Sequence, residues 1–511
     1  MPITKEPEGD QKLVQIGNLI ARLRDDRGIT QTELGKMLGT TQSAIARIEN
    51  GEQNLSTETL SKISKALNKE ILNLSTGSLN LRIEGGKKLS GTIVTKSSKN
   101  SAMGLLSASL LNKNKTILCN MPKIEEVYRM IEVLQSIGVG VKWDGNNLEI
   151  KPPAKFDIKK LDTEAGMKTR SVIMLIGPLI HFSRKFRLPQ PGGCRLGSRT
   201  VKPHFYALEK LGVGIETRSN HYEIKTPKLK PGNIVLYEAG DTVTENAIMA
   251  ASLIPGKTTI KFASANYQVQ DVCFFLESLG VKIEGIGSST LIIHGVESID
   301  KPITYAVSED PIESMFLLSA AIVTKSKIQV MRCPIDFLEL ELLKLEKMGF
   351  RYKILRRYKA ENGRTNLVDI ETYPSKLKAL EDKIHAQPYP GINMDNLPFF
   401  AVIATQAEGQ TFIHDWSYEK RAIYYKDLDK LGADTILADP HRCYINGPTK
   451  LKAAEVICPP ALRPAAILLI GMLAAEGTSI LRNVYSINRG YEDLANRLNK
   501  IGANVSILQS F

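Results

Sequence analysis

A leucine-rich motif that ends in glycine recurs six times along this 511-residue chain, at intervals of about 70 residues. Its copies are LQSIG ending at Gly138, LEKLG at Gly212, LESLG at Gly280, LEKMG at Gly349, LDKLG at Gly432 and LNKIG at Gly502. Each copy predicts the end of a helix, because glycine readily adopts the left-handed conformation that closes one. A β-rich run such as VKIEG or ANVSIL follows, so the chain is predicted to contain six similar units.

Each unit also contains a second helix that is rich in alanine and apolar almost all round. Examples are SAMGLLSASLL, ENAIMAASLI and PAAILLIGMLAAEG, and a strand such as TTIKF or TSILR follows. The unit is therefore predicted as β-α-β-α-β-β. A helix that is apolar on every side must be buried, and these units are too large for ordinary helical solenoid repeats. We expect two similar α/β domains, each with three units around buried helices, and a cleft between them.

The segment ITQTELGKMLGTTQSAIARIENGE, which precedes the repeats, predicts two short helices. Thr30 and Glu33 have the spacing of a capping box, and Gly39 ends the first helix before Thr41 caps the second. This pattern is that of a helix-turn-helix motif.

The second of these helices has one apolar and one polar face. Ile45 and Ile48 are on the apolar face, whereas Gln42, Ser43 and Arg47 face outward. Short polar and guanidinium side chains near a helix N-terminus can reach base edges in the major groove of DNA. The alternative is a small helical module that binds another protein.

Residues 12–70 resemble the helix-turn-helix domain of the phage repressor and Cro type. The resemblance rests on ITQTEL, LGTTQSAIARIENGE and LSTETLSKISKALN. It implies that this segment binds DNA through Gln31, Gln42, Ser43 and Arg47. Such domains usually bind DNA as two-fold pairs, so a homodimer is an open alternative for this chain.

Charge and cysteine usage narrow the class of protein. The net charge of +13 favours anionic partners, which include nucleic acids and phosphorylated metabolites. With no apolar run of about 18 residues and a polar N-terminal segment, we expect a cytoplasmic protein that does not enter a membrane. The cysteines form no C-x-x-C pair, which predicts neither a disulfide framework nor a structural zinc site.

The loop QPGGCRLGSR places Cys194 between a glycine pair and two arginines. Cationic neighbours and an exposed turn are typical of a reactive thiol. The alternative is a loop cysteine that only fills space.

Residues 79–511 resemble the UDP-N-acetylglucosamine enolpyruvyl transferase family, which is related to the shikimate-pathway enolpyruvyl transferase. The motifs that carry the resemblance are SSKNSA, MKTRS, PGGCRLGSR with His204 beyond it, YPGINMDN, YEKR, LRPAA and INRGYE. The resemblance implies an α/β fold of two inside-out α/β barrel domains, preceded by a small all-α helix-turn-helix domain. The expected domains are residues 1–77, residues 78–98 plus 309–511, and residues 99–308.

The resemblance also implies a reaction and the residues that perform it. The family transfers the enolpyruvyl group of phosphoenolpyruvate to the 3-hydroxyl of UDP-N-acetylglucosamine and releases phosphate, the first committed step of peptidoglycan precursor synthesis and so of cell wall growth, cell shape and division. Cys194 matches the general acid and Asp395 the base that takes the acceptor proton. The residues that match the cationic ligands of phosphoenolpyruvate are Lys99, Arg199, Arg463 and Arg489. Of these, Lys99 also matches a catalytic residue.

The acceptor side is expected to involve Asn100, Arg170 and Arg421 together with Asp395. The family requires no metal ion and no organic cofactor, and none is expected here. Arginine suits the anionic substrate because its guanidinium group can hold two oxyanions at once.

The sequence departs from the family pattern on the acceptor side. The differences are at Thr200, Lys202, Asp241, Gln268 and Ala461. A carboxylate at Asp241 would repel a diphosphate unless it is turned away. Two alternatives therefore stay open: enolpyruvyl transfer to a different nucleotide or sugar, and a DNA-binding regulator whose transferase-like body senses a ligand.

Overall fold

The chain forms two compact units, Met1–Gly77 and Ser78–Ser510. The computed structural model describes residues 17–18, 20–25, 27–52, 59, 62–63, 66–67, 79–190 and 200–509. Among the described helices, none is long and apolar enough to cross a membrane.

The small unit contains the two helices predicted from the sequence, α2 (Gln31–Leu38) and α3 (Gln42–Glu49). Thr30 and Glu33 form the predicted capping box, and Gly39 ends α2 in the left-handed conformation with φ 68°. Thr41 then caps α3 by accepting from the backbone N–H of Ala44. A small core holds the helices together; its buried members are Ile20, Leu34, Ile45, Ile48, Ile63 and Leu67.

The large unit repeats the order β-α-β-α-β-β that the sequence predicts, except that, among the described residues, no strand precedes the first helix of the second repeat, whose sheet has three strands. Its first three repeats contain β2 (Ser90–Val94), α5 (Lys99–Ala108), β3 (Thr116–Cys119), α6 (Glu125–Ser136), β4 (Gly140–Asp144) and β5 (Asn147–Lys151); then α7 (Thr163–Lys168), α8 (Ile176–Leu179), β6 (Lys185–Pro189), α9 (Lys202–Glu209), β7 (Gly214–Thr217) and β8 (His221–Lys225); then β9 (Asn233–Val235), α10 (Asp241–Ser252), β10 (Gly256–Lys261), α11 (Tyr267–Ser278), β11 (Lys282–Glu284) and β12 (Thr290–Gly295). In the second repeat a 3₁₀ segment, Arg170–Leu175, leads into α8.

The last three repeats follow the same order. They contain β13 (Ile303–Ala306), α12 (Pro311–Val323), β14 (Lys327–Pro334), α13 (Glu339–Lys347), β15 (Arg351–Lys359) and β16 (Asn366–Tyr373); then β17 (Leu377–Lys378), β18 (Ile384–His385), α14 (Leu397–Ala404), β19 (Ala407–His414), the 3₁₀ helix η6 (Arg421–Leu431), β20 (Asp434–Asp439) and β21 (Arg442–Gly447); then β22 (Glu455–Ile457), α15 (Leu462–Ala474), β23 (Gly477–Arg482), α16 (Tyr485–Asn488), α17 (Leu494–Asn499) and β24 (Val505–Gln509), with β1 (Leu79–Gly85) completing the last sheet.

The six repeat glycines end their helices as predicted. Their φ angles lie between 84° and 100°, in the left-handed region that glycine adopts without a Cβ clash. The last turn can therefore close and the chain can turn directly into the following strand.

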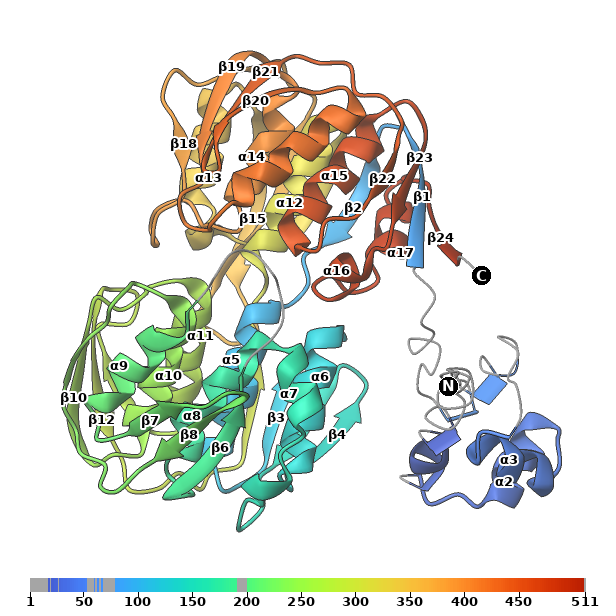
Figure 1. The fold of residues 1–511 in the computed structure, drawn as a ribbon. Helices are drawn as coiled ribbons and strands as arrows, with labels where there is room; N and C mark the ends of the chain where they lie inside the picture. The colour runs from blue at the N-terminus through green and yellow to red at the C-terminus, as the bar shows by residue number, and fades with distance from the viewer. Residues whose placement is uncertain are drawn as a thin grey trace, which may run out of the picture. The chain divides into compact units, whose positions relative to one another are not determined.

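The large unit consists of two halves, each with its own hydrophobic core. The first-half core is drawn from residues 102–307, and the second-half core from residues 81–93 and 312–505, with Tyr267 joining it. In the second half the buried helices α12, α14 and α15 pack against one another, and strands surround them (Figure 1). In the first half α10 packs against both α5 and α8. The predicted architecture of three repeats around buried helices, made twice, is confirmed.

The halves exchange one strand each. β2 pairs in parallel with β14 of the second half, and β13 pairs in parallel with β3 of the first half. The two crossing segments also pair with each other at Ser97 and Glu309. The domain limits of 78–98 plus 309–511 and of 99–308 stay a prediction.

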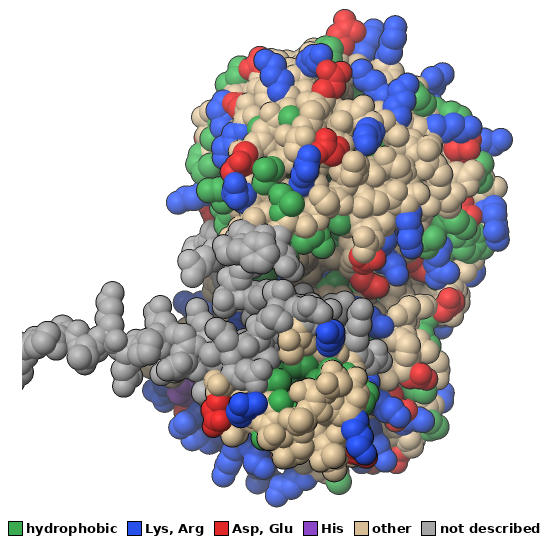
Figure 2. Space-filling model, turned by 90° about the vertical axis from the view of Figure 1, so that its right-hand side faces the viewer, with side chains coloured by type: hydrophobic (Ala, Val, Ile, Leu, Met, Phe, Trp, Pro, Cys, Tyr) green, Lys and Arg blue, Asp and Glu red, His purple; other side chains and the backbone are tan. Residues whose placement is uncertain are grey.

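The positive charge is not gathered in one patch on the face shown in Figure 2. Lys and Arg side chains are spread over both halves there, with acidic side chains among them. The net charge of +13 therefore identifies no anion-binding surface on that face.

Candidate active site

A buried carboxylate, Glu126, joins two of the expected substrate-binding cations. Lys99 is the first residue of α5, whose N-terminus is capped by Ser98. The Lys99 ammonium donates to Glu126 Oε2 at 3.1 Å, and a guanidinium nitrogen of Arg489 lies 3.5 Å from the same oxygen. Arg489 belongs to the second half and Glu126 to the first, so this cluster spans the two halves.

Glu126 is held as an anion in this cluster. Its side chain is 6% exposed, and Thr169 donates to its other carboxylate oxygen at 3.3 Å. Burial acts to raise the pKa of Glu126, but the charges of Lys99 and Arg489 outweigh it and hold the pKa below its usual range. The cluster therefore contains two cations and one anion.

A second cluster surrounds Asp395, the expected base. Arg463 donates to Asp395 Oδ2 at 3.1 Å, and Arg421 lies 3.8 Å from Oδ1. Burial acts to raise the pKa of Asp395, but the charges of Arg463, Arg421 and Lys99 hold it below its usual range. Asp395 is thus an ionised carboxylate at neutral pH, which is the form that can accept a proton.

Two further residues fix the arginines of this cluster. Asp415, which is fully buried, accepts from Arg421 at 2.6 and 2.8 Å, so most of that guanidinium is already engaged. Tyr491 accepts from Arg463 Nη1 at 3.0 Å, which leaves its Nη2 for Asp395. Sequence reasoning had identified neither Asp415 nor Tyr491 as part of the site.

Asn100 lies next to Lys99 at the start of α5. Its Nδ2 donates to the hydroxyl of Tyr267 at 3.0 Å, and the Tyr267 ring packs on Phe337 of the second half with centroids 5.8 Å apart. Burial raises the pKa of Tyr267 well above its usual range, so its hydroxyl stays protonated. Asn100 is therefore held at the junction of the halves.

Arg170 lies beside Thr200 at the start of the described residues 200–509. One of its guanidinium nitrogens donates to the Thr200 carbonyl oxygen at 3.2 Å. Burial, with a contribution from Arg170, lowers the pKa of His204 to about 3, so His204 is neutral near pH 7. Cys194 and Arg199 lie outside the described residues.

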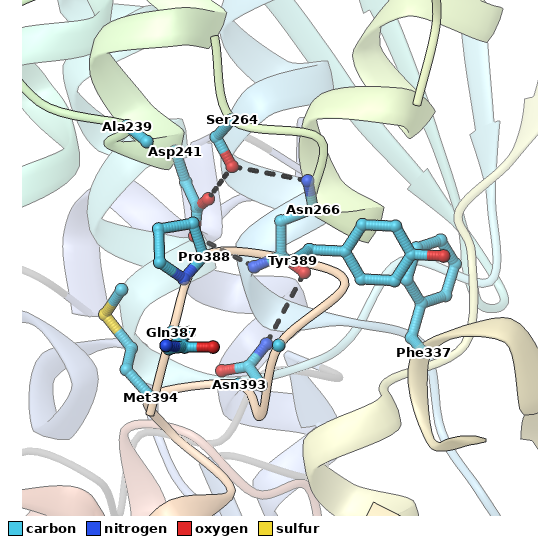
Figure 3. Close-up of a pocket in the computed structure, with 11 residues that line it drawn as sticks. Ala239, Asp241, Ser264, Asn266, Phe337, Gln387, Pro388, Tyr389, Asn393 and Met394 are labelled. Carbon is cyan, nitrogen blue, oxygen red and sulfur yellow. Dashed lines mark hydrogen bonds between the residues drawn. The ribbon is translucent and has the colours of Figure 1, made fainter. Parts of the chain in front are cut away.

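A pocket lies between the halves, next to the turn that carries Asp395 (Figure 3). Its lining residues are Ala239, Asp241, Ser264, Asn266, Phe337, Gln387, Pro388, Tyr389, Gly391, Asn393 and Met394. The Asp241 carboxylate accepts from Ser264 Oγ at 2.5 Å and from Asn266 Nδ2 at 3.0 Å. The carboxylate is thus fixed in the wall of the pocket.

The other departures from the expected pattern also have defined surroundings. Gln268 is buried and donates to Glu245 at 3.4 Å, beneath α5 rather than in the pocket wall. Lys202 is exposed at the start of α9, and Ala461 is buried directly before α15. Among the described residues, no group of three His, Cys, Asp or Glu side chains is arranged to hold a metal ion.

The comparisons with known proteins agree with this architecture. Residues 83–498 match the family model of EPSP synthase (3-phosphoshikimate 1-carboxyvinyltransferase), and residues 20–74 match a helix-turn-helix model. The UDP-N-acetylglucosamine 1-carboxyvinyltransferases of Bradyrhizobium diazoefficiens and Treponema denticola are both 34% identical to this chain, over 83% of it and over 96% and 98% of their own lengths. The solved enolpyruvyl transferase NikO from Streptomyces tendae has the same fold, with a TM-score of 0.75 at 24% identity over 85% of this chain and 100% of that one.

The chain belongs to the EPSP synthase family of enolpyruvyl transferases and carries an N-terminal helix-turn-helix domain. Within that family, the named relatives above are UDP-N-acetylglucosamine 1-carboxyvinyltransferases.

The structure brings together Lys99, Arg489, Asp395, Arg463 and Arg421 in two neighbouring clusters, since the charge of Lys99 also acts on Asp395. Glu126 is the main residue that sequence reasoning missed. In the sequence it is one of two adjacent acidic residues in the first turn of a helix, which is a common capping pattern. Only the fold shows that it faces two cations from distant segments.

Proposed function

We propose that the large unit transfers the enolpyruvyl group of phosphoenolpyruvate to the 3-hydroxyl of UDP-N-acetylglucosamine and releases phosphate. The observation that carries the proposal is the pair of clusters around Glu126 and Asp395, which combines four cations with one ionised candidate base. A substrate with a phosphate and a carboxylate needs several cations, and these come from both halves.

In the proposed reaction the substrate anion takes the place of Glu126 as the partner of Lys99 and Arg489. The Cys194 thiol gives a proton to the methylene carbon, and the acceptor oxygen then bonds to the neighbouring carbon. Asp395 takes the proton of the acceptor hydroxyl. The Cys194 thiolate then takes back a proton from the methyl group as phosphate leaves, which restores the double bond and the thiol and gives the enol ether. A thiol suits the first step because its ordinary pKa of about 8.5 keeps it mostly protonated at neutral pH.

A different acceptor is the second candidate. Asp241 supports it, because a fixed carboxylate in the pocket wall disfavours a diphosphate at that point.

For the small unit we propose DNA binding through α3. Gln42, Ser43 and Arg47 are all exposed on this helix. A DNA-binding regulator that senses phosphoenolpyruvate and the acceptor without turning them over is the remaining alternative for the whole chain.

Phosphate release from phosphoenolpyruvate with a panel of UDP-sugars tests these proposals together. We expect turnover with UDP-N-acetylglucosamine and none without an acceptor. Turnover with another nucleotide sugar alone would identify the second candidate. Binding of both ligands without phosphate release would favour the regulator.

A further inference from the structure

Asn393 organises the turn that carries Asp395. Its backbone N–H, its carbonyl oxygen and both polar atoms of its side chain all take part in hydrogen bonds. The Asn393 carbonyl oxygen accepts from the backbone N–H groups of Asn396 at 2.9 Å and Leu397 at 3.1 Å. Its side-chain oxygen accepts from the backbone N–H of Asp395 at 2.9 Å. The backbone of Asp395 is therefore fixed by the residue two positions before it.

Glu341 accepts hydrogen bonds from the same turn. It lies on α13 and is 2% exposed. One oxygen, Oε1, accepts from the backbone N–H of Asn393 at 3.1 Å and from Asn396 Nδ2 at 2.9 Å. A single buried carboxylate oxygen thus holds the residues on both sides of Asp395.

The helix itself gives no reason for a carboxylate at this position. Leu338, Leu342 and Leu345 of the same segment are buried in the second-half core, so an apolar side chain would suit the helix. Burying a carboxyl group costs free energy unless its hydrogen bonds repay it. The hydrogen bonds that Glu341 accepts from Asn393 and Asn396 both come from the turn, so the turn is what this side chain stabilises.

Asn393 also connects the turn to the opposite half. Its Nδ2 lies 3.5 Å from Asn266 Oδ1, and Asn266 Nδ2 donates to Asp241 at 3.0 Å (Figure 3). Asn266 caps α11, which also carries Tyr267, the partner of Asn100. A polar chain therefore runs from buried Glu341, past Asp395, to the far wall of the pocket.

We propose that Glu341 and Asn393 are positioning residues that hold the Asp395 carboxylate in place for proton transfer. This inference rests on the proposed function, because it needs Asp395 to act as the base. Glu341 acts through Asn393 and Asn396, whereas Asn393 also fixes the backbone of Asp395 directly. A displacement of about 1 Å can lower a rate by about 100-fold, so their effect should be seen in turnover rather than in binding.

The test compares Glu341→Leu, Glu341→Gln and Asn393→Ala with wild type, and uses Glu339→Gln as the control. Glu339 is exposed on the same helix. We expect Glu341→Leu and Asn393→Ala to lower kcat by about 10-fold to 100-fold with little change in the KM for phosphoenolpyruvate. Glu341→Gln should keep most of the activity, because its amide oxygen can accept the same two hydrogen bonds. The control should match wild type.

Two further readouts separate positioning from general damage. In Glu341→Leu the acid limb of the kcat profile should move to higher pH, because a displaced Asp395 loses part of the influence of Arg463. The backbone amide of Asn393 should also exchange with solvent faster in Glu341→Leu than in Glu341→Gln, and this measurement needs no substrate.

Wild-type kcat and an unchanged acid limb in Glu341→Leu would overturn the inference. Equal losses in the Leu and Gln variants, with no shift of the acid limb, would also overturn it, since the oxygen acceptor would then not matter. If wild type released no phosphate with any acceptor, the proposed function would fail. Amide exchange would still show whether Glu341 holds the turn.

Discussion

Arg463 and Asp395 form an ion pair of 3.1 Å between the last repeat and the one before it. Arg463 is 6% exposed, and its charge is the main influence that opposes burial and keeps the Asp395 pKa low. One residue expected to bind the substrate therefore also sets the protonation state of the expected base.

This pair predicts the pH dependence of turnover. Because the pKa of Asp395 is lowered, its carboxylate stays ionised as the pH falls through the ordinary aspartate range near 3.9. Removing the positive charge in Arg463→Gln should raise that pKa, so kcat measured at saturating phosphoenolpyruvate should start to fall at a higher pH. Arg482→Gln, which alters an exposed arginine paired with Glu455, is the control. An acid limb that stays in place in Arg463→Gln would contradict this view of the pair.

Replacing the base itself should affect the rate more than binding. Asp395→Asn keeps the shape of the side chain but cannot take up the acceptor proton, so we expect kcat to fall by about 10² to 10⁴ with little change in KM. Asp382→Asn, at an exposed position before the same turn, should behave as wild type. A rate close to wild type in Asp395→Asn would mean that the base is another residue, and Ala461 provides no carboxylate to replace it.

Glu126→Gln should destabilise the protein and increase the rise in Tm that phosphoenolpyruvate causes. The variant leaves Lys99 and Arg489 without their shared anion, and breaking a buried ion pair costs about 3 to 5 kcal/mol. Since the pKa of folded Glu126 is lowered, its contribution is present above the unfolded pKa of about 4.3 and is lost as the pH falls through the folded pKa. The difference in stability from wild type should therefore shrink in acid.

Thermal unfolding with and without phosphoenolpyruvate measures both effects. The substrate anion should raise the Tm of Glu126→Gln by more than it raises that of wild type, because it supplies the missing charge. Glu125→Gln is the control, since Glu125 pairs with Arg129 instead. Equal ligand shifts in wild type and Glu126→Gln would argue against Lys99 and Arg489 as substrate ligands.

Cys194 should be the thiol that reacts first with an electrophile. Burial raises the pKa of the described cysteines, to about 11 for Cys458 and about 12 for Cys333 and Cys443. The epoxide fosfomycin alkylates the matching cysteine in the family that this sequence resembles, so we expect one added inhibitor on the peptide that carries Cys194. Cys194→Ala should lose this label and about 10² to 10⁴ in rate. Mass spectrometry that finds the label on another cysteine would refute the assignment.

The sequence predicts the repeated architecture well because its signals are local. The glycine at each helix end and the alanine-rich helices are short-range patterns, and both describe what the structure contains. The exchange of β2 and β13 between the halves leaves no local signal, because the paired residues Thr116 and Ile303 lie 187 positions apart and Ser90 and Lys327 lie 237 apart. The expected domain limits that contain this exchange come from the family resemblance and not from a local pattern.

The same limit applies to the site. Lys99, Asp395 and Arg463 could be named from motifs, whereas Glu126, Glu341 and Tyr491 acquire their roles from contacts between distant segments. Glu341 is the clearest case. In the sequence it is one acidic residue among leucines on a charged helix, and only the fold shows that its carboxylate is buried against the turn that carries Asp395.

Helix α3 is the proposed DNA-binding helix of the small unit. Gln42 donates to Gln31 at 2.6 Å, and Gln31 in turn donates to Glu49 at 2.8 Å, so the amide of Gln42 is held in a fixed orientation on the surface. A fixed amide and a nearby guanidinium can read base edges. Arg47→Ala and Gln42→Ala should each weaken specific binding by about 1 to 3 kcal/mol.

Selection of sequences from a random DNA pool with the intact protein, followed by affinity measurements over a salt series, tests this prediction. Affinity should fall steeply with salt as counterions are released from the phosphates. Lys228→Ala, which removes one exposed charge from the large unit, is the matched control and should bind as wild type. A protein without residues 1–77 should lose DNA binding and keep phosphate release, because every proposed catalytic residue lies after residue 78. If no sequence is enriched, or if Arg47→Ala binds as tightly as wild type, the helix-turn-helix unit serves as a protein contact instead.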